Sequence, residues 1–211
     1  MNYIIACETL KPELSAVMGD RDYPIAWIPS GKHSKTEVLR QCIQEAVDAV
    51  SEEYSAVLLV FGFCGNSLAG VTARRQPLIL PRVADCIPLF LGSQAERDSY
   101  GAGYYFFTEG YMRSESTVIS EFSRCVEKYG AEEGTDLMKE MLKHYADFAV
   151  IDTGAFDGNA LAQEIRPFAD ALNLRVSVIP GNIRLLRKLI AGDWNEDEFL
   201  IAPPGGAIIP R

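Results

Sequence analysis

The sequence predicts an α/β fold with two similar Rossmann-like lobes, mostly parallel sheets and a cleft between the lobes. Three observations lead to this prediction. Short apolar segments typical of strands alternate with longer amphipathic segments typical of helices along the whole chain. Most of the short segments end at Gly, Pro, Ser or Thr, residues that favour turns. Part of the pattern in the first half of the chain returns in the second half.

The expected elements follow one another in regular order. Strands are expected at residues 3–7, 25–28, 56–61, 78–80, 104–108, 148–152, 176–179 and 199–202. The clearest helix lies between the second and third strands, where apolar residues from Val38 to Val50 recur at steps of three and four. Cys42 belongs to this apolar stripe, and Cys125 lies in a similar stripe near Phe122. Both cysteines are therefore expected to pack in the core.

The internal repeat suggests two lobes, residues 1–100 and 101–211. Gly-Asn follows one expected strand at 65–66 and another at 158–159, an offset of 93 residues. Ile-Leu-Pro at 79–81 is matched by Val-Ile-Pro at 178–180, so the order is kept. Chance similarity between two ordinary βα units is the alternative, because Gly-Asn is a common turn. With two lobes, a ligand is expected where the carboxyl ends of the strands meet, in the cleft between them.

Composition and charge exclude several classes of function. The chain has 211 residues, with 20 basic and 29 acidic side chains, so its net charge is −9. Such a charge repels phosphate backbones, and nucleic acid is not expected as a partner. No apolar run approaches the roughly 20 residues that cross a bilayer, so no membrane segment is expected. The start of the chain has no basic region before its apolar stretch, and a cytoplasmic location is expected.

Three of the five cysteines lie at or shortly after the ends of expected strands. They are Cys7, Cys64 and Cys86. Thiolates that converge from separate strand ends suit a soft metal, either zinc or an iron–sulfur cluster with one open position, and we favour the cluster. Two alternatives stay open, because buried cysteines also serve as small apolar side chains and one of them could be a single reactive thiolate.

Other polar residues at strand ends complete the candidate site. His33, in the loop after the second strand, and Glu109, after the fifth, are candidates for proton transfer. The candidate ligand-binding residues are Gly65, Asn66, Asp85, Thr108, Tyr111, Asp157 and Asn159. Asp85 would orient the neighbouring Cys86 as a ligand without binding the metal itself. Asn66 and Asn159 each follow a Gly at the expected start of a helix, where helix capping is the competing interpretation.

With these residues in view, the chain resembles the uncharacterised family known as domain of unknown function 1638. The motifs that carry the resemblance are Ala-Cys-Glu within 5–8, Gly-x-His at 31–33, Gly-x-Cys-Gly-Asn at 62–66, Pro-Arg-x-x-Asp-Cys-Ile at 81–87, Leu-Gly-Ser at 91–93 and the aromatic strand with its Thr-x-Gly-aromatic end at 104–111. The resemblance spans nearly the whole chain. This sequence has Ala84 where members usually have His, which favours an all-thiolate site over a Cys/His site. It also has Tyr111 where Trp is common.

The resemblance implies a cellular setting but no assigned reaction. Members occur in methanogenic archaea and anaerobic bacteria, often encoded near corrinoid-dependent methyltransferases. The first hypothesis is therefore a three-thiolate metal protein of anaerobic one-carbon metabolism that acts on a small molecule in the cleft, with a corrinoid protein or methyltransferase as a possible partner. The second is a non-catalytic module that binds a small ligand or a corrinoid protein and uses its cysteines only for packing. Both hypotheses leave open whether the protein is an enzyme.

Overall fold

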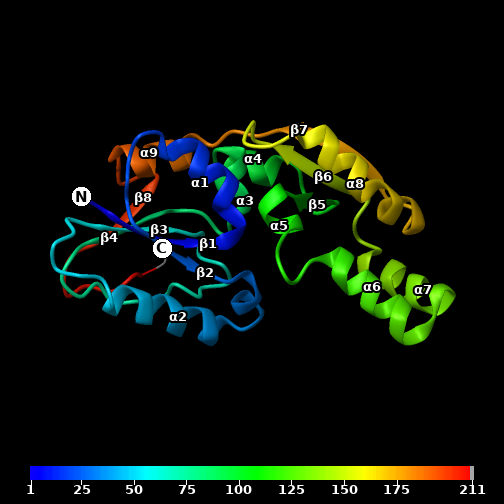
Figure 1. The fold of residues 1–211 in the computed structure, drawn as a ribbon, viewed down its shortest axis with the longest axis horizontal. Coiled ribbons are helices and arrows are strands. Elements are labelled where there is room, and N and C mark those ends of the chain that lie inside the picture. The colour runs from blue at the N-terminus through cyan, green and yellow to red at the C-terminus, as the bar shows by residue number, and fades with distance from the viewer. Residues whose placement is uncertain (210–211) are drawn as a thin grey trace.

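A computed structural model describes residues 1–209, apart from the side chain of Ser34, and it has two sheets. The first sheet has the strand order β2-β1-β3-β4-β8, and the second has the order β5-β6-β7 (Figure 1). The strands are β1 (Tyr3–Cys7), β2 (Ile25–Ile28), β3 (Val57–Val60), β4 (Leu78–Pro81), β5 (Tyr104–Phe107), β6 (Asp147–Asp152), β7 (Arg175–Pro180) and β8 (Phe199–Ala202). All neighbouring strands are parallel except β4 and β8, which are antiparallel. The predicted α/β class with mostly parallel sheets is confirmed.

Helices cover the sheets on both faces. They are α1 (Lys11–Met18), α2 (Thr36–Asp48), α3 (Ile87–Leu91), α4 (Gln94–Ser99), α5 (Glu109–Met112), α6 (Val118–Tyr129), α7 (Ala131–Leu142), α8 (Gly158–Ala171) and α9 (Arg184–Ala191), with short 3-10 helices η1 (Glu8–Leu10) and η2 (Ser30–Ser34). Helix α2 lies on one face of the first sheet, and α1 and α9 lie on the other (Figure 1). Among the described residues, no helix is both long and apolar enough to cross a membrane.

One hydrophobic core extends across both sheets. It contains buried residues of the first sheet, such as Ile5 and Leu59, together with Ala149 and Ile151 of β6. The opposite face of the second sheet forms a separate cluster with α6, α7 and α8, in which Phe148 is fully buried. The two sheets are therefore joined by apolar packing, and β6, the central strand of the second sheet, is buried on both faces, as is usual for parallel strands.

The end of the chain returns to the first sheet. Helix α9 packs against α1, β3 and β4, and β8 pairs with β4 from Leu78↔Ala202 to Pro81↔Phe199. The sequence analysis places these residues in the second lobe, whereas the structure places them in the layers of the first. The turn between α9 and β8 is short, so the chain reaches the open edge of the sheet without a crossover, and a strand that returns in this way pairs antiparallel.

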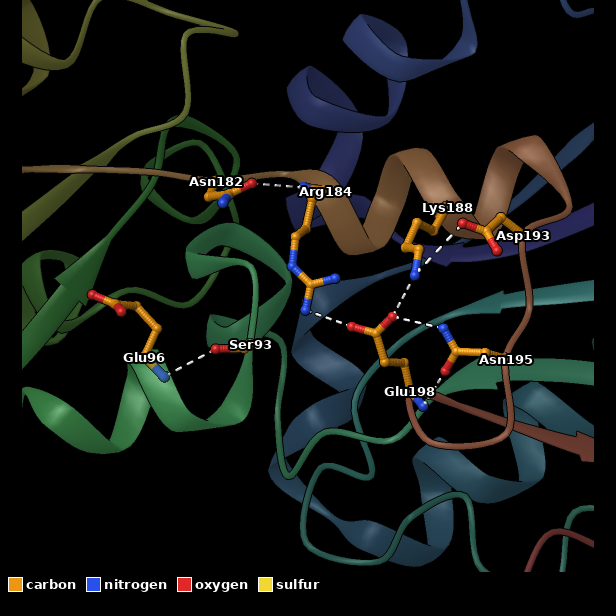
Figure 2. A network of polar contacts seen from close by, with 8 residues as sticks. All are labelled: Ser93, Glu96, Asn182, Arg184, Lys188, Asp193, Asn195 and Glu198. Atoms are coloured by element: carbon orange, nitrogen blue, oxygen red, sulfur yellow. Dashed lines mark hydrogen bonds and ion pairs between the residues drawn. The ribbon is translucent and has the colours of Figure 1, made fainter.

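A polar network fixes this return. The carboxylate of Glu198 binds Arg184 and Lys188 of α9, and it accepts a hydrogen bond from Asn195 Nδ2 at 2.9 Å (Figure 2). Lys188 also pairs with Asp193 at 3.5 Å. These donors lower the pKa of Glu198 to about 2, because they stabilise the ionised carboxylate. The network ties α9 to the strand that follows it.

The internal repeat corresponds to similar structure only in part. The matching segments at 79–81 and 178–180 both end strands, and the helices that come after them, α3 and α9, both end at a left-handed glycine, Gly92 with φ 90° and Gly192 with φ 86°. After β6 the repeat continues into α8, but after β3 the chain forms turns without a helix. Each half of the chain supplies four strands, but β8 of the second half joins the sheet of the first half, so the two sheets have five and three strands.

Candidate functional site

A cavity of about 350 Å³ lies between the first sheet and the edge strand of the second. One wall comes from the carboxyl ends of β1 and β2 and from the start of α3, and the other comes from α4, β5 and the segment after it. The lining residues are Cys7, Thr9, Ser30, His33, Cys86, Ile87, Phe90, Arg97, Tyr104, Tyr105, Phe106, Thr108, Tyr111, Ser114, Ser116 and Tyr145. The cavity thus lies beyond the strand ends of the first sheet, where ligands of open α/β sheets bind.

The three predicted thiols lie close together at the first wall. Cys7 ends β1 and its Sγ lies 3.2 Å from Thr9 Oγ1, whereas Cys86 directly precedes α3. Burial raises the pKa of Cys7, and it raises that of Cys86 well above its ordinary value. Burial, together with the nearby charges of Cys7 and Asp85, raises the pKa of Cys64 to about 12. Cys7 disfavours ionisation of Cys64, and both of them disfavour ionisation of Cys86, in keeping with the place of Cys7 and Cys86 in one cavity lining.

A left-handed turn holds Cys64 beside the segment that carries Cys86. The φ angles are 45° at Cys64, 66° at Gly65 and 66° at Asn66. A Cβ atom on Gly62 would lie 2.2 Å from the carbonyl oxygen of Asp85, so only glycine permits the close approach of the two segments. The backbone N–H of Cys64 donates to the carbonyl of Ala84 at 2.8 Å. A non-glycine residue in this region costs on the order of 1–3 kcal/mol, and such strain is often found at functional sites.

Ser30 and His33 form the polar part of the first wall, and Glu8 lies behind it. The backbone N–H of Ser30 donates to Glu8 Oε1 at 2.7 Å, and this hydrogen bond lowers the pKa of Glu8. Burial lowers the pKa of His33, although the charge of Glu8 partly offsets the effect. The His33 ring stacks on Phe61 with 6.3 Å between ring centroids. At neutral pH the imidazole is therefore uncharged and held in place.

Aromatic side chains form the second wall. Tyr104, Tyr105 and Phe106 of β5 all line the cavity. The hydroxyl groups of Tyr105 and Tyr111 lie 2.8 Å apart, and Tyr111 Oη also accepts the backbone N–H of Val118 at 2.9 Å. Burial raises the pKa of both tyrosines, so their hydroxyls stay protonated. Of these rings the sequence singled out only Tyr111 as a candidate ligand-binding residue, but the rings of β5 line the cavity as well.

The structure brings about half of the predicted site residues together. Five line the cavity, namely Cys7, His33, Cys86, Thr108 and Tyr111. Cys64 lies beside them but is not part of the lining. Among the residues that the structure describes, no group of three or more His, Cys, Asp or Glu side chains is arranged to hold a metal ion. The thiols cluster, but their ligation of a metal stays a prediction.

The other predicted residues lie outside the cavity lining and have local structural contacts. Glu109, the first residue of α5, pairs with Arg113 just after the end of that helix, at 2.9 Å. Asp85 Oδ1 accepts the N–H of Ile87 at 2.8 Å and so begins α3.

Helix starts and turns account for the remaining four. Asp157 caps α8 by accepting the N–H groups of Asn159 and Ala160, each at 3.0 Å. Gly65 and Asn66 form the exposed turn after β3. Asn159 neither lines the cavity nor caps the helix. Its exposed side chain lies on α8, and Asp157 is the capping residue.

Several lining residues were not among the predicted site residues. Arg97 comes from α4, Ser114 and Ser116 precede α6, and Tyr145 follows α7. None of these positions directly follows a strand, so a search of strand ends does not find them. The aromatic run in β5 could have indicated a second wall. Its four consecutive rings point alternately to both faces of the strand, so they cannot all pack in one core.

Fold and cavity together define an α/β protein of two packed, mostly parallel sheets with a cavity of small-molecule size at their junction. The chain belongs to the family described as Protein of unknown function (DUF1638), whose profile matches residues 27–190. Neither the curated proteins nor the solved structures include a match to this chain.

Proposed function

We propose that the protein binds a small organic molecule in the cavity between its two sheets. The observation that carries this proposal is the cavity itself, whose 350 Å³ falls within the usual range of ligand sites and whose walls come from both sheets. Its lining is rich in aromatic rings, with few convergent polar groups, which is the typical composition of such sites. The thiols of Cys7 and Cys86 and the imidazole of His33 are the groups that would face the ligand.

Blocking the cavity tests this proposal. Ser116 lines the cavity and is exposed, so Ser116→Trp should fill the opening without disturbing the core. Ser123→Trp, at an exposed position on α6 outside the lining, is the matched control. Binding of benzoate, benzamide and benzyltrimethylammonium is measured by saturation-transfer NMR. We expect at least one probe to bind the wild type and the control but not Ser116→Trp, and binding that is absent, or unchanged by Ser116→Trp, would refute the proposal.

A three-thiolate metal centre is the second candidate. The observation that favours it is that Cys7 and Cys86 line one cavity and that Cys64 is hydrogen-bonded to the segment that carries Cys86. Their raised pKa values oppose thiolate formation in the absence of a cation, and a bound soft metal would offset this by lowering them. Such a metal would be held at the first wall of the cavity, within reach of a ligand there.

Metal analysis of anaerobically purified protein tests the second candidate. Cys64→Ser and Cys86→Ser should each lower the iron or zinc content, whereas Cys42→Ser and Cys125→Ser should leave it unchanged. Less than about a tenth of an equivalent of both metals in the wild type would remove this candidate. The predicted link to corrinoid-dependent methyl transfer stays a prediction, and anaerobic co-purification with a corrinoid protein would test it.

A further inference from the structure

Three polar atoms that lack a hydrogen-bond partner belong to residues that line the cavity. Across the part of the chain that the structure describes, the buried side-chain atoms without a partner are Glu13 Oε2, Ser30 Oγ, His33 Nε2, Arg40 Nε and Arg97 Nε. Ser30, His33 and Arg97 all line the same cavity. Buried polar groups in native proteins are nearly always paired, with protein, water or ligand. Three such atoms around one cavity indicate a ligand with polar groups of its own.

The charge of the lining selects the kind of polar group. The whole chain carries a net charge of −9, yet among the described residues no carboxylate lines the cavity, and Arg97 is the one permanently charged side chain of the lining. Glu8 lies behind the wall, where its carboxylate is already bound to the N–H of Ser30. A cation would meet Arg97 at short range, and an uncharged ligand would leave the Arg97 charge without a counterion. An anion is the complement of this lining.

The orientation of Arg97 favours a carboxylate. Its Cζ lies 4.9 Å from the centroid of the Phe106 ring, and its Nη1 donates to the carbonyl of Gly101 at 3.3 Å. These contacts hold the guanidinium at the cavity wall, and within residues 1–209 it takes part in no ion pair. The Nε–H therefore remains available on one edge of the guanidinium. A carboxylate accepts two parallel N–H hydrogen bonds from such an edge. The ammonium group of a lysine cannot form this paired arrangement.

We propose that the cavity ligand is a small carboxylic acid with an apolar, preferably aromatic, body. This inference rests on the proposed small-molecule function. The carboxylate accepts hydrogen bonds from Arg97, and the body packs against the rings of Tyr104 and Tyr105. Ser30 and His33 are three residues apart in the 3-10 helix η2, so their side chains project to the same side and bind a further polar group of the ligand.

Matched pairs of probes test the inference on the full-length wild-type protein. The pairs are benzoate with benzamide and 3-phenylpropionate with 3-phenylpropionamide, because each acid and its amide share size and shape. Benzyltrimethylammonium is the cationic probe, since aromatic walls also attract cations. Titration calorimetry or NMR should give at least tenfold tighter binding for each acid than for its amide, and the cation should bind no better than the amides.

Arginine variants connect this preference to one side chain. Arg97→Gln should reduce the acid-to-amide ratio to about one, while Arg97→Lys, which keeps the charge but has no Nε–H, should give an intermediate ratio. Arg124→Gln, at an exposed position on α6, is the matched control and should keep the wild-type ratio. Because the readout is a ratio, a merely structural effect of the substitution weakens both members of a pair and leaves the ratio unchanged.

The outcomes separate this inference from the proposed function. If an amide or the cation binds as tightly as the acids, or if Arg97→Gln and Arg97→Lys both keep the preference, the inference is overturned and the small-molecule site stands. If no probe binds the wild type, both are overturned. If circular dichroism shows that Arg97→Gln is unfolded, the test is the acid-to-amide ratio of Arg97→Lys. A ratio equal to that of the wild type overturns the inference, and a lower ratio supports it.

Discussion

Cys64 has a backbone conformation that residues other than glycine and asparagine rarely adopt. Its φ of 45° belongs to a run of three left-handed residues that places its thiol beside Cys86. A Cβ atom is unfavourable in this region, by roughly 1 kcal/mol or more relative to glycine. Cys64 therefore destabilises this turn relative to glycine.

The variant with glycine at position 64 should therefore be more stable than the variant with alanine. Cys64→Gly and Cys64→Ala both remove the thiol, but glycine relieves the left-handed strain, so we expect it to be the more stable variant by about 1 kcal/mol. Urea unfolding at pH 7 measures the difference. At Cys42, in helix α2, the order should be reversed because glycine destabilises a helix by about 1 kcal/mol relative to alanine. The same order at both positions would show that the turn is not left-handed.

At the scale of single elements, a buried carboxyl joins α1 to the loop after β6. Glu13 is fully buried, and its Oε1 accepts a hydrogen bond from the Thr153 hydroxyl at 3.0 Å, across 140 residues of sequence. Burial raises the pKa of Glu13 to about 7, and the nearby charge of Glu109 acts in the same direction. The carbonyl oxygen of Thr9, in η1 just before α1, would lie 1.9 Å from a Cβ atom on Gly110. The two sheets are thus in close contact here.

Stability should fall as the pH rises because of Glu13. The pKa is about 7 in the folded state against an ordinary value of 4.5, so between these pH values the folded state holds a proton that the unfolded state has lost. The free energy of unfolding therefore decreases from pH 5 to pH 8. Glu13→Gln should remove a decrease on the order of 1–3 kcal/mol, as measured by urea unfolding at both pH values. Exposed Glu45→Gln should leave the decrease in place, and an identical pH dependence in Glu13→Gln would refute the assignment.

The network around Glu198 should give the opposite pH dependence. Its folded pKa of about 2 lies below the ordinary 4.5, so its stabilising contribution is complete above pH 4.5 and is lost as the pH falls through 2. Glu198→Gln should lower the free energy of unfolding by about 1–3 kcal/mol at pH 7, because Arg184 and Lys188 lose their charged partner. The difference from wild type should shrink toward pH 2. Neighbouring Glu196→Gln, with an exposed side chain, is the control, and equal effects of the two substitutions would count against the network.

At the scale of the whole molecule, the shared core predicts that the two sheets unfold together. Residues of β6 such as Ala149 and Ile151 pack in the same cluster as the first sheet, and β8 brings the end of the chain back to β4. Unfolding followed by tryptophan fluorescence reports on Trp27 and Trp194, which both pack against that cluster. It should coincide with unfolding followed by circular dichroism, which reports on all helices. Two separate transitions would show that the lobes are energetically independent.

Much of the architecture was predictable from local patterns. Each expected strand is present, with ends that differ from the expected ones by no more than one residue, because apolar runs bounded by turn residues define strands locally. Cys7 and Cys86 were found as cavity residues by the same reasoning, since they lie at or shortly after strand ends. The pairing of β8 with β4 was not predictable, because an edge strand and a lobe boundary depend on contacts between segments far apart in the chain.

The sequence by itself determined the α/β class, the position of the strands and the placement of thiols near strand ends, because periodicity and turn residues act over a few neighbours. Only the tertiary structure decided which side chains share the cavity. Arg97, Tyr145 and the serines before α6 reach it through the packing of one sheet against the other. That packing depends on apolar surfaces that meet only after the chain has folded, so no local pattern records it.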